Sequence, residues 1–176
     1  LHTAQIQGFF DGPVDHLLAM PILTRYVRKN YGKKPLAVVS PDAGRIKVAE
    51  QWARQFDNAP LAFIHKTRDV TKANVSKANR VVGEVEGRTC ILVDDLIDTG
   101  GTICQAAEAL MNDGAAEVII VSTHAVFSGE AVNRLKDSVA TEVIVTNTLP
   151  LEDDKHFDKL TVLSIAPLLA QAVSAV

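Results

Sequence analysis

Three acids and a Thr-Gly-Gly-Thr turn stand close together near the middle of the sequence. An apolar run ends in Asp94 and Asp95, Asp98 follows, and residues 99–102 lead into apolar residues at helical spacing. Glycines let backbone amides turn inward without a Cβ penalty, and amides at a helix N-terminus bind phosphate. The Gly-Lys-Ser/Thr ending of a Walker loop is missing. The pattern therefore predicts a phosphate-binding turn of another kind, formed by Thr99, Gly100, Gly101 and Thr102.

The three acids need a role of their own beside this turn. Carboxylates accept hydrogen bonds, so a sugar with adjacent hydroxyls would use them as fixed acceptors, and they can also hold Mg²⁺ directly or through water. In a second interpretation Asp98 merely caps the helix and the other acids are solvated. Capping explains one acid and leaves Asp94 and Asp95 without a role. We therefore interpret residues 94–102 as a sugar-phosphate site.

Apolar runs with almost no polar alternation predict the strands that position this loop. Segments with helical spacing separate these runs, which favours a parallel sheet covered on both faces. In such sheets ligands bind beyond the carboxyl ends of the strands. The sequence thus predicts one α/β domain with an open, mainly parallel sheet and helices on both faces. The expected strands are 35–40, 60–65, 80–85, 88–95, 117–123, 142–147 and 160–165, and the expected helices are 19–30, 43–56, 103–111, 129–136 and a final apolar one.

Composition narrows the class of protein. Hydrophobic residues make up 47% and charged residues 22%, which suffices for a sizeable core, and the net charge of −3 gives no reason to expect nucleic acid or an anionic membrane as a partner. No apolar run approaches the roughly 18 residues of a membrane span. Cys90 and Cys104 lie in apolar contexts and are predicted to be buried free thiols, which fits a reducing cytoplasm.

The stretch "VDDLIDTGGT" (93–102) resembles the phosphoribosyl pyrophosphate (PRPP) signature shared by type I phosphoribosyltransferases and PRPP synthetases. Residues 1–17, 38–44 and 146–150, together with "IHKTR" at 64–68, resemble ribose-phosphate pyrophosphokinases, the PRPP synthetases. The resemblance to that family covers essentially the whole chain. A phosphoribosyltransferase would share only the loop and the general fold.

The resemblance implies a phosphoribosyltransferase-like fold and assigns roles to further residues. The acids would take the ribose hydroxyls and the turn the 5-phosphate, in an enzyme that moves diphosphate from Mg-ATP to ribose 5-phosphate to give PRPP and AMP. His2 and Asp42 match the positions that support the Mg²⁺-ATP complex. From the residues alone, His2 reads equally as a surface histidine and Asp42 as a turn residue. Gln7 and Asp15 resemble positions of a regulatory nucleotide site.

Residues 66–79 are polar and lack a clear period, which predicts a long loop. Within residues 66–80, Lys66, Arg68, Lys72, Lys77 and Arg80 stand against the single acid Asp69. Lys66 and Arg68 match the family's two cationic residues on a mobile catalytic loop. Their implied role is to stabilise charge on the transferring diphosphoryl group as the loop closes.

Two departures from the family pattern stand out. Many members have a second glycine after the Asp-Ala-Gly turn, whereas Arg45 follows here and either narrows the freedom of the diphosphate loop or supplies another cation. Family chains also carry an N-terminal domain before the Leu1-His2 pair, with adenine contacts and much of the oligomer interface, and a C-terminal tail. We therefore expect residues 1–176 to be a single domain resembling the C-terminal half of a homo-oligomeric synthetase. Alone it should have little activity.

Two other functions compete with this interpretation. A phosphoribosyltransferase would consume PRPP with a base, but residues 1–17 and the Lys66/Arg68 pair argue against it. A non-catalytic, synthetase-associated regulator would have a degraded loop or an altered cationic pair, and both are intact in this sequence.

Overall fold

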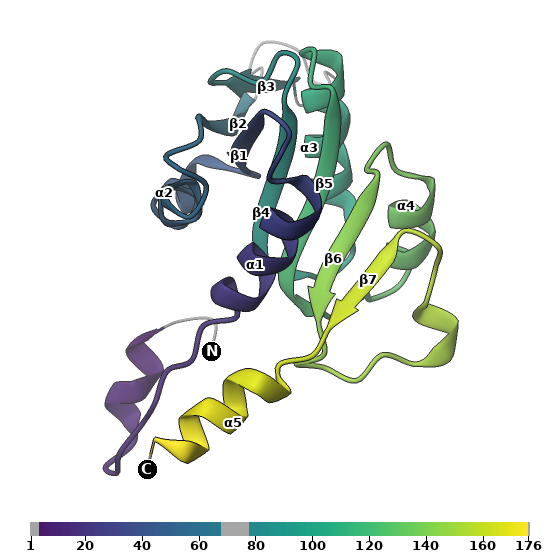
Figure 1. The fold of residues 1–176 in the computed structure, drawn as a ribbon. Coiled ribbons are helices and arrows are strands. Elements are labelled where there is room, and N and C mark those ends of the chain that lie inside the picture. The colour runs from purple at the N-terminus through teal and green to yellow at the C-terminus, as the bar shows by residue number, and fades with distance from the viewer. Residues whose placement is uncertain (1–3, 68–77, 176) are drawn as a thin grey trace.

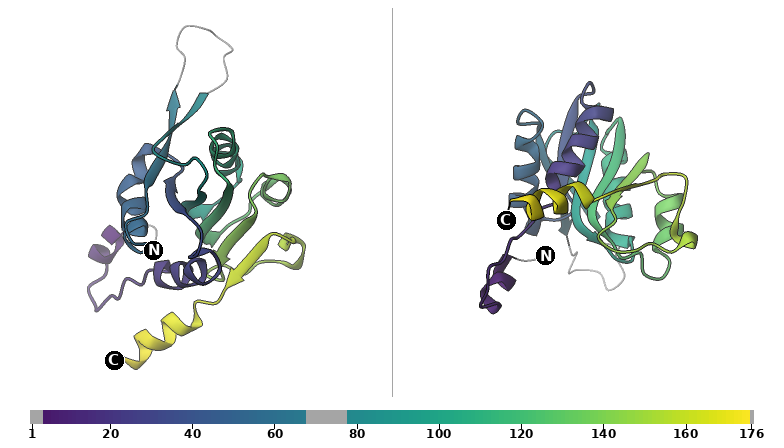
Figure 2. Two further views of the ribbon diagram at one scale, coloured as in Figure 1. Left: turned by 45° about the horizontal axis from the view of Figure 1, so that its top comes forward. Right: turned by 60° about the horizontal axis from the view of Figure 1, so that its bottom comes forward.

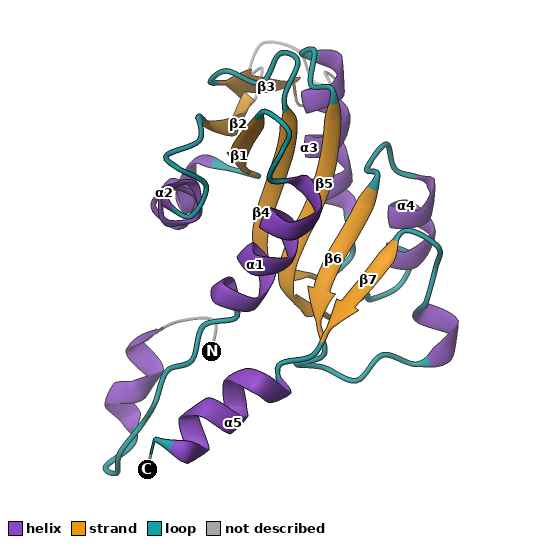
Figure 3. Ribbon diagram, viewed as in Figure 1, coloured by secondary structure: helices purple, strands orange, loops and turns teal. Residues whose placement is uncertain are grey.

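The computed structural model describes residues 4–67 and 78–175. The strands are β1 (Leu36–Ser40), β2 (Leu61–Thr67), β3 (Ala78–Val82), β4 (Thr89–Ile97), β5 (Glu117–Ala125), β6 (Glu142–Thr146) and β7 (Leu160–Leu163). The helices are α1 (Met20–Tyr31), α2 (Ile46–Arg54), α3 (Gly101–Asn112), α4 (Ala131–Asp137) and α5 (Ala166–Ser174). Three short 3₁₀ helices are η1 (Ala4–Phe9), η2 (Ala43–Arg45) and η3 (Asp153–Lys155). Figure 3 distinguishes the strands from the helices and loops.

The described strands form one seven-stranded sheet in the order β3-β2-β1-β4-β5-β6-β7. β3 pairs with β2 in antiparallel fashion, and the other neighbours are parallel. Figure 1 shows α1 in front of the sheet, with α3 and α4 behind it. This arrangement confirms the predicted open, mainly parallel sheet with helices on both faces.

Each face of the sheet has its own apolar core. On one face Ile91 and Val93 of β4 pack with Leu23 of α1 and Trp52 of α2. On the other face the intervening β4 residues pack against Leu110 of α3 and against α4. A central strand buried on both sides needs apolar residues at every position, which is why the β4 segment shows no polar alternation before its acids.

The predicted free thiols are confirmed. Cys90 on β4 and Cys104 on α3 are buried and unpaired with one another. Burial raises the pKa of the Cys90 thiol to about 12 and that of Cys104 to about 11. Both side chains are therefore protonated and unreactive at neutral pH.

The order of the strands reverses between β1 and β4, which are direct neighbours. β2 lies on the far side of β1 and β5 on the far side of β4, so the connections leave in opposite directions. Loops that follow two such strands diverge and leave a crevice at the carboxyl end of the sheet. The loop after β1 carries Asp42, and the three-acid stretch spans the end of β4 and the start of the loop after it.

Several element boundaries differ from the predictions, and the largest differences concern residues 43–56, 80–85 and 66–79. The helix expected over 43–56 divides into η2 and α2, because the Asp42 side chain accepts a hydrogen bond from the Gly44 amide and tightens the first turn. The strand expected over 80–85 ends at Val82, because Gly83 adopts a φ of +122° and passes close to the Leu61 carbonyl. The predicted bounds of the loop over 66–79 are wrong at both ends, since β2 continues to Thr67 and β3 begins at Ala78.

The two ends of the described chain project from the body of the domain. Figure 1 and the left view of Figure 2 show the N-terminal segment and α5 extending away from the sheet. α5 was predicted as an apolar helix, but none of its described residues is buried, and Val173 is 77% exposed. Phe9, just before the turn that leads to α1, is 89% exposed. Within the described residues, no helix is both long enough and apolar enough to span a membrane.

Candidate active site

Asp94 and Asp95 lie within the C-terminal part of strand β4 rather than in the loop after it. β4 continues to Ile97, so pairing with β5 fixes the backbone of both acids, with Asp94 opposite Ser122. The Asp95 amide donates to Asp94 Oδ1 at 2.9 Å, and the Leu96 amide donates to Asp95 Oδ1 at 2.9 Å. Strand pairing and these local hydrogen bonds hold the two carboxylates at the carboxyl end of the sheet.

The glycine turn follows directly and begins helix α3. Gly100 is the N-cap residue and has a left-handed φ of +74°, a conformation that favours glycine. The interpretation in which Asp98 caps the helix is therefore wrong, and no side chain caps α3. The first amides of a helix have no partner within the helix, so those of α3 are available to an anion.

A second loop reaches the same region from β1. Asp42 Oδ1 accepts a hydrogen bond from the Gly44 amide at 2.8 Å, and the Ser40 hydroxyl donates to the Asp42 carbonyl at 2.6 Å. These contacts shape a tight turn that ends at Arg45. Asp42 is thus a turn-forming residue, and its side chain also lines the cavity described below.

Arg45 joins the two loops through ion pairs. Its Nη2 lies 2.9 Å from Asp95 Oδ1 and its Nε lies 3.4 Å from Asp94 Oδ1. The sequence offered two consequences for an arginine at this position, a narrower loop or an additional cation. The geometry supports the additional cation, because the guanidinium lies directly against the acids.

A cavity of about 340 Å³ lies between these loops. It brings together most of the residues predicted from the sequence, and it adds Arg45, Leu96, Ile97 and Ile103. The predicted residues that line it are Asp42, Asp94, Asp95, Asp98, Thr99, Gly100, Gly101 and Thr102. Carboxylate acceptors together with a glycine turn at a helix N-terminus suit a hydroxyl-bearing phosphate ester.

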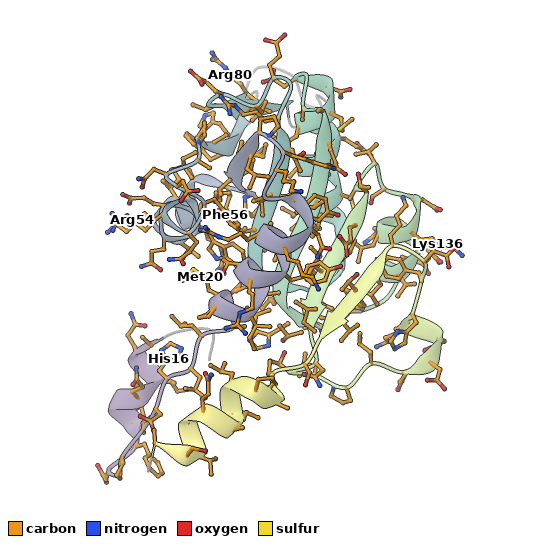
Figure 4. The ribbon with its side chains drawn as sticks, in the orientation of Figure 1. His16, Met20, Arg54, Phe56, Arg80 and Lys136 are labelled. Atoms are coloured by element: carbon orange, nitrogen blue, oxygen red, sulfur yellow. The ribbon has the colours of Figure 1, made fainter. Side chains whose placement is uncertain are left out.

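A second cavity of about 260 Å³ shares Arg45, Asp94 and Asp95 with the first. Its other walls are mainly apolar and include Met20 and Trp52. Figure 4 places Met20 at the start of α1, beside the segment that carries His16. The Arg45–acid cluster therefore stands at the boundary between a polar and a largely apolar cavity.

The environment of Asp94 disfavours its charged form. Burial is the main cause that raises the pKa of this carboxyl to about 7, and the hydrogen bond with Asp95 adds to the rise. The Arg45 guanidinium acts in the opposite direction and lowers the pKa. Hydrogen-bond donors or cations that approach Asp94 would stabilise the carboxylate, so the site favours such partners.

The remaining predicted residues fall outside this cavity or outside the described residues. Lys66 lies near the end of β2, but its side chain is outside the described part, as are His2 and Arg68. Gln7 lies in η1, where its side-chain amide donates to the Ala4 carbonyl, and Asp15 is exposed in the following segment. Neither Gln7 nor Asp15 lines either cavity.

No cluster of three or more metal-ligating side chains is present in residues 4–67 and 78–175. Of the predicted metal pair, Asp42 lies within this part of the chain, whereas His2 lies outside the described residues. The Mg²⁺ site thus stays a prediction.

The stretch 146–150, noted only as a family resemblance, has a structural role that the sequence did not reveal. The hydroxyls of Thr146 and Thr148 donate to the Thr123 carbonyl at 2.8 and 3.2 Å, and the Thr148 hydroxyl also pairs with His124 Nδ1 at 2.8 Å. Asn147 Oδ1 accepts the Ile165 amide at 2.9 Å. These contacts join the carboxyl ends of β5 and β6 to the start of α5, beside the second cavity.

Comparison with known proteins identifies the family of the chain. The family model described as "Phosphoribosyl synthetase-associated domain" matches residues 58–176. The ribose-phosphate pyrophosphokinase of Bifidobacterium longum is 60% identical over 178 residues, covering 100% of this chain and 52% of that protein. The enzyme of the same name from Mycobacterium tuberculosis is 60% identical over 176 residues, covering 100% of this chain and 54% of that protein. The chain thus spans about half the length of these relatives.

Solved structures show the same relationship. The phosphoribosylpyrophosphate synthetase of Mycobacterium smegmatis superposes with a TM-score of 0.91 at 58% identity, covering 99% of this chain and 56% of that one. The APRTase of Giardia lamblia has a TM-score of 0.53 at 15% identity, covering 72% of this chain and 77% of that one. The second match shows a shared fold alone.

Proposed function

The chain belongs to the phosphoribosyl synthetase-associated domain family, and from this premise we propose that it is the ribose 5-phosphate-binding part of a ribose-phosphate pyrophosphokinase. The complete enzyme would transfer the β,γ-diphosphoryl group of Mg-ATP to the anomeric hydroxyl of ribose 5-phosphate. The products are PRPP and AMP. The observation that carries this proposal is the cavity in which the acids of β4 and the glycine turn of α3 face one ligand-sized volume.

The ribose and its phosphate would divide between the two ends of this cavity. Asp94, Asp95 and Asp98 accept hydrogen bonds from the sugar hydroxyls. The amides and hydroxyls of residues 99–102 take the 5-phosphate at the N-terminus of α3. This places the sugar's reactive carbon on the side of the β1 loop, from which the diphosphoryl group would arrive.

Charge neutralisation carries much of a phosphoryl-type transfer, and the chain has cations for it. Lys66 stands near the end of β2, the strand that neighbours β1, and Arg68 follows two residues later. We assign both to stabilising the transferring diphosphoryl group, as the family resemblance implies.

Mg²⁺ is the cofactor in this proposal. Asp42 fits such an ion chemically, because it offers carboxylate oxygen, the ligand type that Mg²⁺ prefers, on the wall of the cavity. His2 would be its partner. When bound with ATP, the ion supplies charge neutralisation on the phosphates.

The relatives are about twice as long as this chain, so the proposed enzyme includes parts beyond residues 1–176. The proposed partners are ATP, bound together with an N-terminal domain, and further copies in a homo-oligomer. Residues 1–176 would form one domain with little synthetase activity by itself, and Gln7 and Asp15 would complete a regulatory nucleotide site only in the whole enzyme. Buried reduced thiols support a cytoplasmic location.

Calorimetric titration of the chain with ribose 5-phosphate tests the proposal. We expect saturable binding that weakens about tenfold or more in Asp98→Asn, because one acceptor of the sugar loses its charge. Asp113→Asn is the matched control, since Asp113 is exposed at the opposite end of α3. Lack of binding by the parent chain, or equal binding by Asp98→Asn, would overturn the assignment.

A further inference from the structure

The guanidinium of Arg45 contacts the acid pair at oxygens that are already hydrogen bonded. Asp95 Oδ1 accepts both the Leu96 amide at 2.9 Å and Arg45 Nη2 at 2.9 Å. Asp94 Oδ1 likewise accepts the Asp95 amide at 2.9 Å and lies 3.4 Å from Arg45 Nε. A carboxylate oxygen has two lone pairs, so the Leu96 amide and the guanidinium, each at 2.9 Å, engage both of those on Asp95 Oδ1. Arg45 also forms an ion pair with Asp94 Oδ1.

The proposed sugar hydroxyls would approach the same two carboxylates. The Asp95 carboxylate has little room for a sugar hydroxyl, because its Oδ2 is buried and its Oδ1 is in contact with the Arg45 guanidinium. A hydroxyl that donates to Asp95 would therefore replace the guanidinium. Since Arg45 is 30% exposed and stands between two cavities, its side chain has space into which it can move.

The charges around the cavity indicate which ligand group a displaced Arg45 side chain would bind. Among the described residues that line the first cavity, Arg45 is the only cation, and it faces four acids, Asp42, Asp94, Asp95 and Asp98. Its guanidinium forms ion pairs with Asp94 and Asp95. A diphosphate group that enters beside the β1 turn would find little positive charge from these residues until Arg45 leaves the acids.

We propose that Arg45 is a diphosphate-binding residue that the sugar releases: the acid pair holds its guanidinium, and the hydroxyls of ribose 5-phosphate replace it there. This inference rests on the proposed function. It assigns a role to the arginine that replaces a glycine found in many family members. It also gives the two ligands positive coupling, because each ligand favours the arrangement in which Arg45 points away from the acids.

Calorimetry with two probes on the full chain tests this exchange. Inorganic diphosphate is titrated at a fixed Mg²⁺ concentration, without and with saturating ribose 5-phosphate. We expect ribose 5-phosphate to increase the diphosphate affinity of the parent about fivefold or more. In Arg45→Gln this increase disappears, and in Arg45→Lys it is partial, because lysine keeps the charge but lacks the planar fork.

Arg54→Gln is the control. Arg54 forms an ion pair of the same length, 2.9 Å, with Glu50 on the exposed side of α2, where Figure 4 shows it pointing outward. This variant should couple the two ligands as the parent does. Coupling that persists in Arg45→Gln, or that is absent from the parent, overturns the inference while binding of ribose 5-phosphate leaves the proposed function intact. Failure of the parent to bind ribose 5-phosphate overturns both.

Discussion

Nη1 of Arg134 on helix α4 lies 2.8 Å from the carbonyl oxygen of Thr99 in the glycine turn. The contact comes from outside the cavity, since Arg134 is not among the residues that line it. The Arg134 carbonyl in turn lies 3.6 Å from the Cys104 thiol on α3. Helix α4 therefore supports the turn and brings a positive charge close behind the place proposed for the 5-phosphate.

Replacement of this cation should weaken phosphate binding without abolishing it. We expect Arg134→Gln to lower the affinity for ribose 5-phosphate about two- to fivefold at low salt, because the residue is exposed and its charge is partly screened. Titrations at low and high ionic strength check this, and the difference from the parent should shrink as salt rises. Lys136→Gln is the control, since Lys136 is an exposed cation on the same helix that Figure 4 shows pointing into solvent.

The backbone conformation of Gly100 leads to a second prediction. An added Cβ would meet only ordinary contacts, the nearest being Ala131 at 3.6 Å, so the cost of Gly100→Ala comes from its φ of +74°. That cost is about 1–2 kcal/mol if the left-handed conformation is kept. Relaxing the strain would turn the amides of the phosphate turn away, so ribose 5-phosphate binding should fall about tenfold or more.

Gly87→Ala separates strain from function in this experiment. Gly87 has a similar φ of +68°, no atom lies within 4 Å of its added Cβ, and it lines neither cavity that borders the acids. Chemical denaturation should show a comparable loss of stability for both variants, whereas calorimetry should show a loss of binding for Gly100→Ala alone. Equal binding by the two variants would contradict the assigned role of the turn.

The fold was predictable because its signals are local. The β4 segment is apolar from Cys90 to Val93, and the α3 stripe ends at Gly114, which adopts a φ of +91° just beyond the helix as a C-terminal glycine does. The phosphate turn was predictable for the same reason, since its threonines and glycines are consecutive. Their chemistry follows from the residues themselves.

The contacts that complete the site were not predictable, because they join segments distant in the sequence. Arg45 meets Asp94 only because β1 and β4 are neighbours at the point where the strand order reverses. Arg134 reaches Thr99 through the packing of α4 beside α3. Neither residue has a local pattern that distinguishes it from a surface arginine, so the sequence indicated only that Arg45 departs from the family.

The shifted pKa of Asp94 makes stability depend on pH. Its folded pKa of about 7 lies above the ordinary value of 3.8, so between these values the unfolded chain gives up this proton while the folded chain keeps it. The free energy of unfolding therefore falls as pH rises through this range, and the contribution of the protonated group is fully present only below about pH 4. The ionised acid pair is a source of instability at neutral pH when no ligand is bound.

Asp94→Asn removes this titration and keeps an oxygen that can accept the Asp95 amide. We expect the variant to gain stability relative to the parent as pH rises from about 4.5 to 7.5, by on the order of 1–3 kcal/mol, because a pKa difference of one unit corresponds to about 1.4 kcal/mol and the side chain is partly exposed. Denaturant unfolding at several pH values measures it. Asp113→Asn, remote from the pair, should follow the parent curve, and a parallel curve for Asp94→Asn would contradict the pKa assignment.

A polar cluster at the start of β6, at the end of the sheet opposite the acids, gives a last prediction. Glu142 on β6 accepts hydrogen bonds from the hydroxyls of Tyr26 at 2.7 Å, Tyr31 and Thr161, and so joins α1 to β6 and β7. Burial, followed by the hydrogen bond and charge of Glu142, raises the pKa of Tyr31 above its ordinary value of 10. Burial is also the main cause that raises the pKa of Tyr26, with Glu142 contributing.

These two residues are the only tyrosines of the chain, so the ultraviolet absorbance of phenolate reports on this cluster alone. We expect the phenols of the folded chain to ionise at higher pH than those of the denatured chain, which should titrate near 10. Because the folded pKa values are raised, this part of the stability is present below pH 10 and is lost as pH rises above it. Glu142→Gln should lower both phenol pKa values, since it removes the negative charge, and destabilise the domain by about 1–3 kcal/mol. Glu152→Gln, at an exposed position before η3, is the control, and an unchanged titration in Glu142→Gln would show that burial alone sets these values.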